Sequence, residues 1–303
     1  MDLDWRAHQR WVTVAERRVN VVELGSGPPL VFVHGLSGSW QNWLEQLPAF
    51  ARDHRVIAMD LPGFGESEMP AAKISIPGYA RWLDALLDEL GVGVTAVVGN
   101  SMGGFIGAEL AIQFPPRVER LVLVSAAGLT VEHQRHDRAL AVLRTLDKRL
   151  AAYAGWVGTR SDVLMRRRRV RRAVFGIIAH DPASLPAPLV AEQVRGSGKP
   201  GFVDALDAIT DYPIRDRLGE IGCPTLIVWG TEDRLVPVGD ADDFERLIPN
   251  SRKVVWPDTG HVAMLERPAA FNRLVAAFLA EEPGERVGAS SASGAPDAPR
   301  VSP

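Results

Sequence analysis

The chain is organised around one stretch, Val94-Thr95-Ala96-Val97-Val98-Gly99-Asn100-Ser101-Met102-Gly103-Gly104. Its apolar start predicts a buried strand, and the small residues at its end predict the beginning of a helix. The G-x-S-x-G pattern between them requires a turn so tight that Ser101 takes a strained backbone conformation, and side chains larger than glycine at 99 and 103 would collide. Such a turn projects the serine hydroxyl off the end of the sheet, towards the positive N-terminus of the helix. A glycine-rich turn can also contain a serine by chance, so the rest of the chain must show whether Ser101 has a function.

Composition narrows the classes of protein that this chain can belong to. Its 303 residues, 46% of them hydrophobic, suit one large globular domain or a domain with an insertion. A net charge of −3 gives no basic field for nucleic acid. Cys223 is alone and cannot form an internal disulfide, so a cytoplasmic location is the simplest expectation. The charged N-terminus lacks a signal-peptide core, and no apolar run approaches the ~20 residues of a membrane span.

Strand and helix patterns alternate along most of the chain. This alternation predicts an α/β fold with a mostly parallel sheet flanked by helices on both faces. A long helix is expected over 76–90, where apolar residues recur at three-four spacing, and a final helix over 268–280. Eight strands are predicted, at 10–14, 18–22, 30–33, 55–59, 94–98, 120–125, 224–229 and 253–256.

The alternation breaks between residues 127 and 211, where only helical patterns remain. An all-helical insertion in such a sheet is expected to form a cap, or lid, over the strand ends. Helices are predicted there at about 132–155, 160–180, 184–195 and 200–210. The predicted organisation is an α/β core in two parts, 1–126 and 212–282, a helical cap at 127–211 and a disordered Gly/Ala/Ser/Pro tail at 283–303.

A catalytic serine needs a base, which is itself oriented by an acid. Of the seven histidines, only His34 and His261 lie at the C-terminal end of a predicted parallel strand, His261 in the loop after the last one. The loop after the preceding strand contains Glu232 and Asp233, and we favour Asp233 as the acid because its short side chain can turn back towards His261. The chain order is then serine, aspartate, histidine.

This order, with the glycine-flanked serine and the His34-Gly35 loop, resembles the α/β-hydrolase family over about 20–126 and 212–281. The resemblance implies an oxyanion hole formed by the backbone N–H groups of Leu36 and Met102, with His34 ordering the loop rather than acting as the base. It implies no cofactor. The stretch from Asp60 to Ser67 also matches the family and is expected to be a structural turn.

The resemblance implies a serine hydrolase that cleaves a small carboxylic ester or related acyl compound through an acyl-enzyme. The serine elbow also resembles that of carbon–carbon bond hydrolases of vinylogous diketones, which is the main alternative. Against it, Val262 stands where those enzymes usually have tryptophan, and no substrate-binding lid arginine can be aligned. A cofactor-free perhydrolase and a non-catalytic ligand-binding protein are further alternatives, although a scaffold would need none of the triad residues.

An apolar substrate pocket is expected beside the serine, with core packing as the competing role for each candidate. No metal site is predicted, because the histidines show no ligand spacing and there is one cysteine. The oligomeric state stays open. The pocket candidates are His34, Gly35, Trp40, Trp43, Asn100, Phe105, Trp156 and Val262.

A run of arginines falls in the predicted cap. Consecutive arginines point in different directions around a helix, so they cannot all face one pocket. The favoured interpretation is a solvated helix face, and the alternative is peripheral contact with anionic lipid or attraction of an acidic substrate. The residues are Arg160, Arg166, Arg167, Arg168, Arg169, Arg171 and Arg172.

Overall fold

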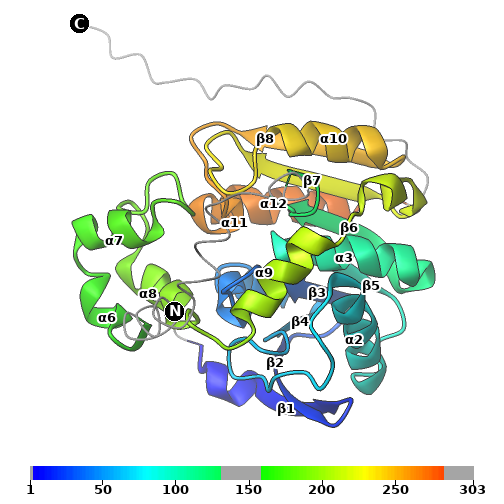
Figure 1. Ribbon diagram of the computed structural model, residues 1–303, viewed down its shortest axis with the longest axis horizontal. Helices are drawn as coiled ribbons and strands as arrows, with labels where there is room; N and C mark the ends of the chain where they lie inside the picture. The colour runs from blue at the N-terminus through cyan, green and yellow to red at the C-terminus, as the bar shows by residue number, and fades with distance from the viewer. Residues whose placement is uncertain (1–2, 131–157, 283–303) are drawn as a thin grey trace, which may run out of the picture.

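The computed structural model describes residues 3–130 and 158–282. Within them, eight strands form one sheet in the order β1-β2-β4-β3-β5-β6-β7-β8 (Figure 1). β2 is antiparallel to β1 and β4, and all pairings from β4 to β8 are parallel, which confirms the predicted fold class. The strands are β1 (Gln9–Val14), β2 (Arg17–Leu24), β3 (Pro29–Val33), β4 (Arg55–Met59), β5 (Thr95–Asn100), β6 (Val118–Val124), β7 (Thr225–Gly230) and β8 (Ser251–Trp256).

The sheet separates two hydrophobic cores. Successive strand residues point to opposite faces, so Val97 belongs to one core and Val98 to the other. Helices α2 (Ile76–Glu89), α3 (Met102–Gln113) and α10 (Gly239–Leu247) cover the first face. Helices α1 (Leu47–Phe50), α11 (Ala263–Glu266) and α12 (Pro268–Leu279) cover the second. Short 3₁₀ helices are η1 (Trp5–His8), η2 (Trp40–Trp43), η3 (Pro115–Arg117) and η5 (Arg215–Glu220).

The capping and packing of two helices, α2 and α3, follow directly from their sequences. α2 begins where the Ser75 hydroxyl accepts a hydrogen bond from the Gly78 N–H at 3.1 Å, and its apolar stripe is buried. α3 is buried almost throughout because its small residues allow close packing on the sheet. A Cβ at Gly107 would lie 3.2 Å from both the Val97 and the Leu121 side chains.

Between β6 and β7, the described residues 158–211 form helices and no strand, and we call this part the helical insertion. Its α6, α7 and α8 gather at the left of the molecule in Figure 1. The prediction of one helix over 160–180 is wrong, because Arg167 has an extended backbone and separates α6 from α7. The predicted helix at 132–155 and the tail at 283–303 lie outside the described residues. The insertion helices are α6 (Ser161–Leu164), α7 (Arg168–Phe175), α8 (Ala187–Arg195) and α9 (Phe202–Asp211).

One arginine of the run has a different role from its neighbours. Arg171 is 5% exposed, and its guanidinium donates to four backbone carbonyls, those of Met165, Arg166, Pro182 and Ala183. These carbonyls lie at the end of α6 and in the turn before α8, so Arg171 holds the broken helix together. The arginines at 166–169 and 172 are exposed, as expected of a solvated face.

The described residues contain neither a membrane-spanning helix nor a cluster of metal-ligating side chains. No helix among them is long and apolar enough to cross a membrane. Nor does any group of three or more His, Cys, Asp or Glu side chains in residues 3–130 and 158–282 lie in an arrangement that could hold a metal ion. Cys223 is partly buried, and burial raises the pKa of its thiol to about 11.

Candidate active site

Three side chains of the predicted site follow three parallel strands at the carboxyl edge of the sheet. Ser101 follows β5, Asp233 follows β7 and His261 follows β8. Parallel α/β sheets place their ligand sites outside this edge, because the loops that leave all these strands meet there. The topology therefore brings residues from distant parts of the sequence to the same region.

Ser101 occupies a strained turn. Its backbone has φ 54° and ψ −117°, a conformation that costs a non-glycine residue about 1–3 kcal/mol. Three backbone hydrogen bonds hold it there: the Ser101 N–H donates to the Val124 carbonyl at 2.9 Å, and the Ser101 carbonyl accepts from Phe105 and Ala127 at 3.1 Å. The surrounding structure thus maintains the strain and fixes the position of the serine.

The flanking glycines are required by close backbone approach. A Cβ at Gly103 would lie 2.1 Å from the Val33 carbonyl oxygen, and a Cβ at Gly99 would lie 2.3 Å from the carbonyl oxygen of Gly103. Real Cβ atoms do not approach backbone oxygens so closely. The glycines therefore let the start of α3 lie directly against the ends of β3 and β5.

Asp233 and His261 form a buried pair. The His261 Nδ1 lies 2.8 Å from Asp233 Oδ2, and the side chain of Asp233 is fully buried. The other carboxylate oxygen, Oδ1, accepts hydrogen bonds from the N–H groups of Leu235 and Val236, both at 2.9 Å. Glu232, the rival acid, is exposed. The carboxylate can therefore orient the imidazole so that Nε2 is free to accept a proton.

The loop that contains His261 is attached to the serine turn through Asn100. The buried Asn100 Nδ2 donates to the carbonyls of Val124 at 3.0 Å and His261 at 3.2 Å. Within the described residues, no hydrogen bond joins the Ser101 hydroxyl to the imidazole. In enzymes without substrate this contact is often loose and tightens in the Michaelis complex.

The His34-Gly35-Leu36 loop lies against Ser101. A Cβ at Gly35 would be 3.1 Å from the Ser101 Cβ. His34 is completely buried, and its Nε2 accepts a hydrogen bond from the Leu61 N–H at 2.9 Å, so the proton is on Nδ1, which donates to the Gly35 carbonyl at 2.7 Å. Burial lowers the pKa of His34 to about 4, so the ring is neutral near pH 7 and fixes the loop.

Two backbone N–H groups beside the serine have no hydrogen-bond acceptor in the part of the chain that the structure describes. Among the described residues, the N–H groups of Leu36 and Met102 donate no hydrogen bond. Met102 is the first residue of α3, where amide groups have no partner within the helix and attract negative charge. As donors without a partner in the described part of the chain, the two amides can bind a negatively charged oxygen.

The buried Asp60 carboxylate fixes the far side of the same loop. It accepts hydrogen bonds at 2.9 Å from the Trp40 N–H, the Asn20 Nδ2 and the Glu66 N–H. Burial is the main reason that the pKa of Asp60 is raised. Its contacts lie within the fold, which agrees with the structural role expected for the stretch from Asp60 to Ser67.

The aromatic pocket candidates have packing partners in the core. The Trp43 ring is fully buried 5.0 Å from that of Phe32, and the Trp40 ring lies 5.2 Å from that of Trp5. Val262 is buried in the second core, and Trp156 lies outside the described residues. The pocket assignments stay predictions, and for Trp43 the packing role is sufficient to explain its position.

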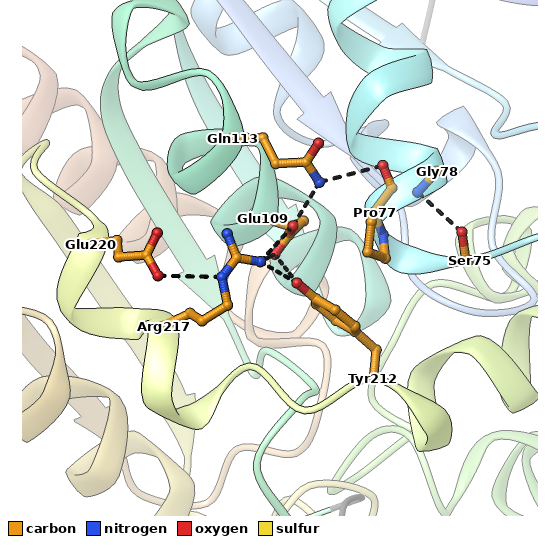
Figure 2. A network of polar contacts seen from close by, with 8 residues as sticks. All are labelled: Ser75, Pro77, Gly78, Glu109, Gln113, Tyr212, Arg217 and Glu220. Atoms are coloured by element: carbon orange, nitrogen blue, oxygen red, sulfur yellow. Dashed lines mark hydrogen bonds and ion pairs between the residues drawn. The ribbon is translucent and has the colours of Figure 1, made fainter.

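A polar network stabilises the helix that starts at the serine turn (Figure 2). The carboxylate of Glu109, on α3, is 1% exposed and pairs with Arg217 at 2.9 Å. It also accepts hydrogen bonds from the Tyr212 hydroxyl at 2.9 Å and Gln113 Nε2 at 2.6 Å. Phe105, another pocket candidate, stacks on Tyr212 with ring centroids 5.9 Å apart. The network thereby joins α3 to the chain that leaves the helical insertion.

One residue near the site was missed by the sequence analysis. The Glu266 carboxylate accepts a hydrogen bond from the Gly260 N–H at 2.8 Å, next to His261. Its position five residues after the histidine carries no pattern that separates it from an ordinary surface glutamate. Only the structure shows that it faces the loop.

Comparisons with known proteins place the chain among hydrolases of known fold. A family model described as alpha/beta hydrolase fold matches residues 28–268. A 2-hydroxy-6-oxo-2,4-heptadienoate hydrolase from Pseudomonas putida is 32% identical, over 90% of this chain and 96% of its own length. Among solved structures, a meta-cleavage product hydrolase from Pseudomonas fluorescens IP01 (TM-score 0.71, 25% identity) covers 89% of this chain and 97% of its own. Est816, described as an N-acyl homoserine lactone degrading enzyme (TM-score 0.69, 28% identity), covers 89% and 100%.

Proposed function

The chain belongs to the alpha/beta hydrolase fold family and is a hydrolase, and from that premise we propose that it cleaves a carboxylic ester or related acyl compound through a Ser-His-Asp triad. The observation that carries the proposal is the pair of Asp233 and His261, whose nitrogen and oxygen atoms are 2.8 Å apart at the sheet edge where Ser101 lies.

Each residue has one task in the proposed reaction. His261 Nε2 takes the proton from the Ser101 hydroxyl as the oxygen attacks the acyl carbonyl, and it then gives that proton to the leaving group. Asp233 holds the imidazole in the required tautomer and stabilises its charged form. The N–H groups of Leu36 and Met102 bind the developing oxyanion, and one such donor is worth about 3 kcal/mol in the transition state. Water, activated by His261, then hydrolyses the acyl-enzyme.

The ester and the carbon–carbon alternatives differ in what supports them. A lactone is a cyclic ester, so the name of the structural neighbour Est816 supports acyl hydrolysis. The names of the other two relatives support cleavage of a vinylogous diketone, which makes this the second candidate. Two arginines of the helical insertion already have partners in the protein: Arg171 binds backbone carbonyls, and Arg195 pairs with Asp162 and Glu192.

A substrate panel separates these candidates. Activated esters of graded acyl length are assayed beside one vinylogous 2-hydroxy-6-oxo-dienoate, with Ser101→Ala as the blank. The proposal expects turnover of at least one ester that the Ser101→Ala variant lacks, with the diketone cleaved poorly. Efficient cleavage of the diketone alone would replace the ester assignment by the second candidate. Equal activity in the Ser101→Ala variant would overturn the triad.

A further inference from the structure

A short segment of the helical insertion, residues 176–180, lies against the loop that contains His261. The His261 N–H donates a hydrogen bond to the Ile178 carbonyl at 2.8 Å. At Gly260 there is no space for a side chain, because a Cβ would lie 2.7 Å from the His180 nitrogen and 2.8 Å from the Ile178 oxygen. The segment and residues 257–261, which we call the base loop, are therefore in direct backbone contact.

The same segment also contacts the loop that contains the acid. Arg234, the residue after Asp233, donates from its guanidinium to the Gly176 carbonyl at 3.1 Å. One stretch of the insertion thus joins the loops after β7 and β8, which carry the two members of the Asp233–His261 pair.

A single carboxylate binds the base loop and segment 176–180 together. Glu266 Oε1 accepts a hydrogen bond from the Gly260 N–H and Oε2 accepts one from the His180 N–H, both at 2.8 Å. The two donors are far apart in sequence, and each takes one carboxylate oxygen. The titratable side chains that act on Glu266 are His180 and Arg267, and burial is the main reason that the pKa of Glu266 is raised.

We propose that Glu266 is a positioning residue, whose bidentate contact with Gly260 and His180 places the His261 imidazole correctly relative to Ser101. The inference rests on the proposed function in one respect, that His261 is the base. Glu266 does not touch the reacting atoms and acts only through the backbone of the base loop. Because an error of about 1 Å in the placement of a catalytic group can cost about 100-fold in rate, a two-point attachment at the residue before the base has a direct effect on turnover.

The test is Glu266→Gln. This substitution keeps the shape and one acceptor oxygen, but it turns an NH₂ group towards the second backbone N–H. We expect kcat for the best ester to fall about tenfold, the effect of about 1.4 kcal/mol in the transition state, with KM changed less than about twofold. Glu266→Ala, which lacks both acceptors, should lose more. The matched control is Asp240→Asn, another carboxylate that accepts a backbone N–H, that of Thr130 at 2.9 Å, and whose pKa is also raised by burial. It should keep kcat within about twofold.

Two further measurements separate positioning from a general loss of stability. The Tm of Glu266→Gln should stay within about 3 °C of wild type, because neutral glutamine avoids the cost of burying a charge. The downfield proton resonance of His261 Nδ1–H should shift or broaden in Glu266→Gln and stay unchanged in Asp240→Asn. Wild-type kcat in Glu266→Gln, or a loss of kcat that only follows a fall in Tm, would overturn the inference. If Ser101→Ala remained active, the proposed function would fail instead, so the two failures can be distinguished.

Discussion

Lowering the pH tests the environment of His34, because the size of the effect follows from its burial. The folded protein lowers the pKa of this ring from 6.5 to about 4. Between these values the unfolded chain binds more protons than the folded one, so the free energy of unfolding falls as the pH decreases. Each pKa unit is worth 1.36 kcal/mol, which makes the loss about 3 kcal/mol by pH 4.

The assay is urea unfolding, followed by tryptophan fluorescence from pH 7 to pH 4, of wild type and His34→Gln. Other groups titrate in this range, so the informative quantity is the difference between the two proteins. The variant is less stable at pH 7, because it loses ring contacts with Gly35 and Leu61, but it lacks the titrating group. The stability difference should therefore shrink by about 3 kcal/mol on acidification.

A partly exposed histidine provides the control. His8→Gln, at a partly exposed position on the N-terminal 3₁₀ helix, is the matched histidine-to-glutamine substitution outside the core. If wild type and His34→Gln instead lost stability in parallel down to pH 4, His34 would not be held neutral by burial. The structural account of the loop beside Ser101 would then be wrong.

Three further substitutions give defined outcomes. Gly103→Ala puts a Cβ 2.1 Å from a backbone oxygen and should cost at least about 3 kcal/mol of unfolding free energy by urea titration. The control Gly93→Ala, whose Cβ would have no atom within 4 Å, should stay within about 0.5 kcal/mol of wild type. Equal stabilities of the two variants would refute the packing argument. Asp233→Asn should lower kcat about 10⁴-fold because it favours the wrong tautomer of His261, and Glu232→Gln should leave kcat unchanged. The reverse result in ester assays would make Glu232 the acid. Arg171→Ala leaves four backbone carbonyls without their donor and should destabilise the helical insertion by about 3 kcal/mol. Limited proteolysis should then cleave the insertion faster than in wild type. An unchanged cleavage rate would contradict the structural role of Arg171.

The strands and the fold class were predictable from sequence because their signals are local. Buried parallel strands read as short apolar runs, and every predicted strand lies within two residues of its observed ends. The position of β4 between β2 and β3 is not determined by the local sequence, because it depends on which strands pair after the chain has crossed over the sheet. The sequence pattern contained no information on that choice.

The candidate site was predictable to the extent that topology brings strand ends together. The positions of Ser101, Asp233 and His261 after separate strands were sufficient to expect them at the same edge of the sheet. The contacts of Glu266 were not predictable, because its two partners are backbone amides whose location depends on the tertiary fold.

The arginine run also shows that a sequence pattern does not reveal which of several similar side chains is buried. In the sequence, Arg171 is one of several similar residues on a presumed helix. In the structure it is buried, while Arg169 and Arg172 are exposed, because the break between α6 and α7 turns carbonyl groups towards it. No pattern of charge or hydropathy distinguishes the buried arginine from its neighbours.

The most direct test of the central claim, that Ser101 is a nucleophile activated by His261, is covalent labelling. Native protein is incubated with a fluorophosphonate, digested and mapped by mass spectrometry, with His261→Ala treated in the same way. The account predicts one adduct per chain, on the peptide that contains Ser101, with labelling strongly slowed in His261→Ala. An adduct at another residue, or ester hydrolysis by a protein that Ser101 labelling does not inhibit, would contradict it.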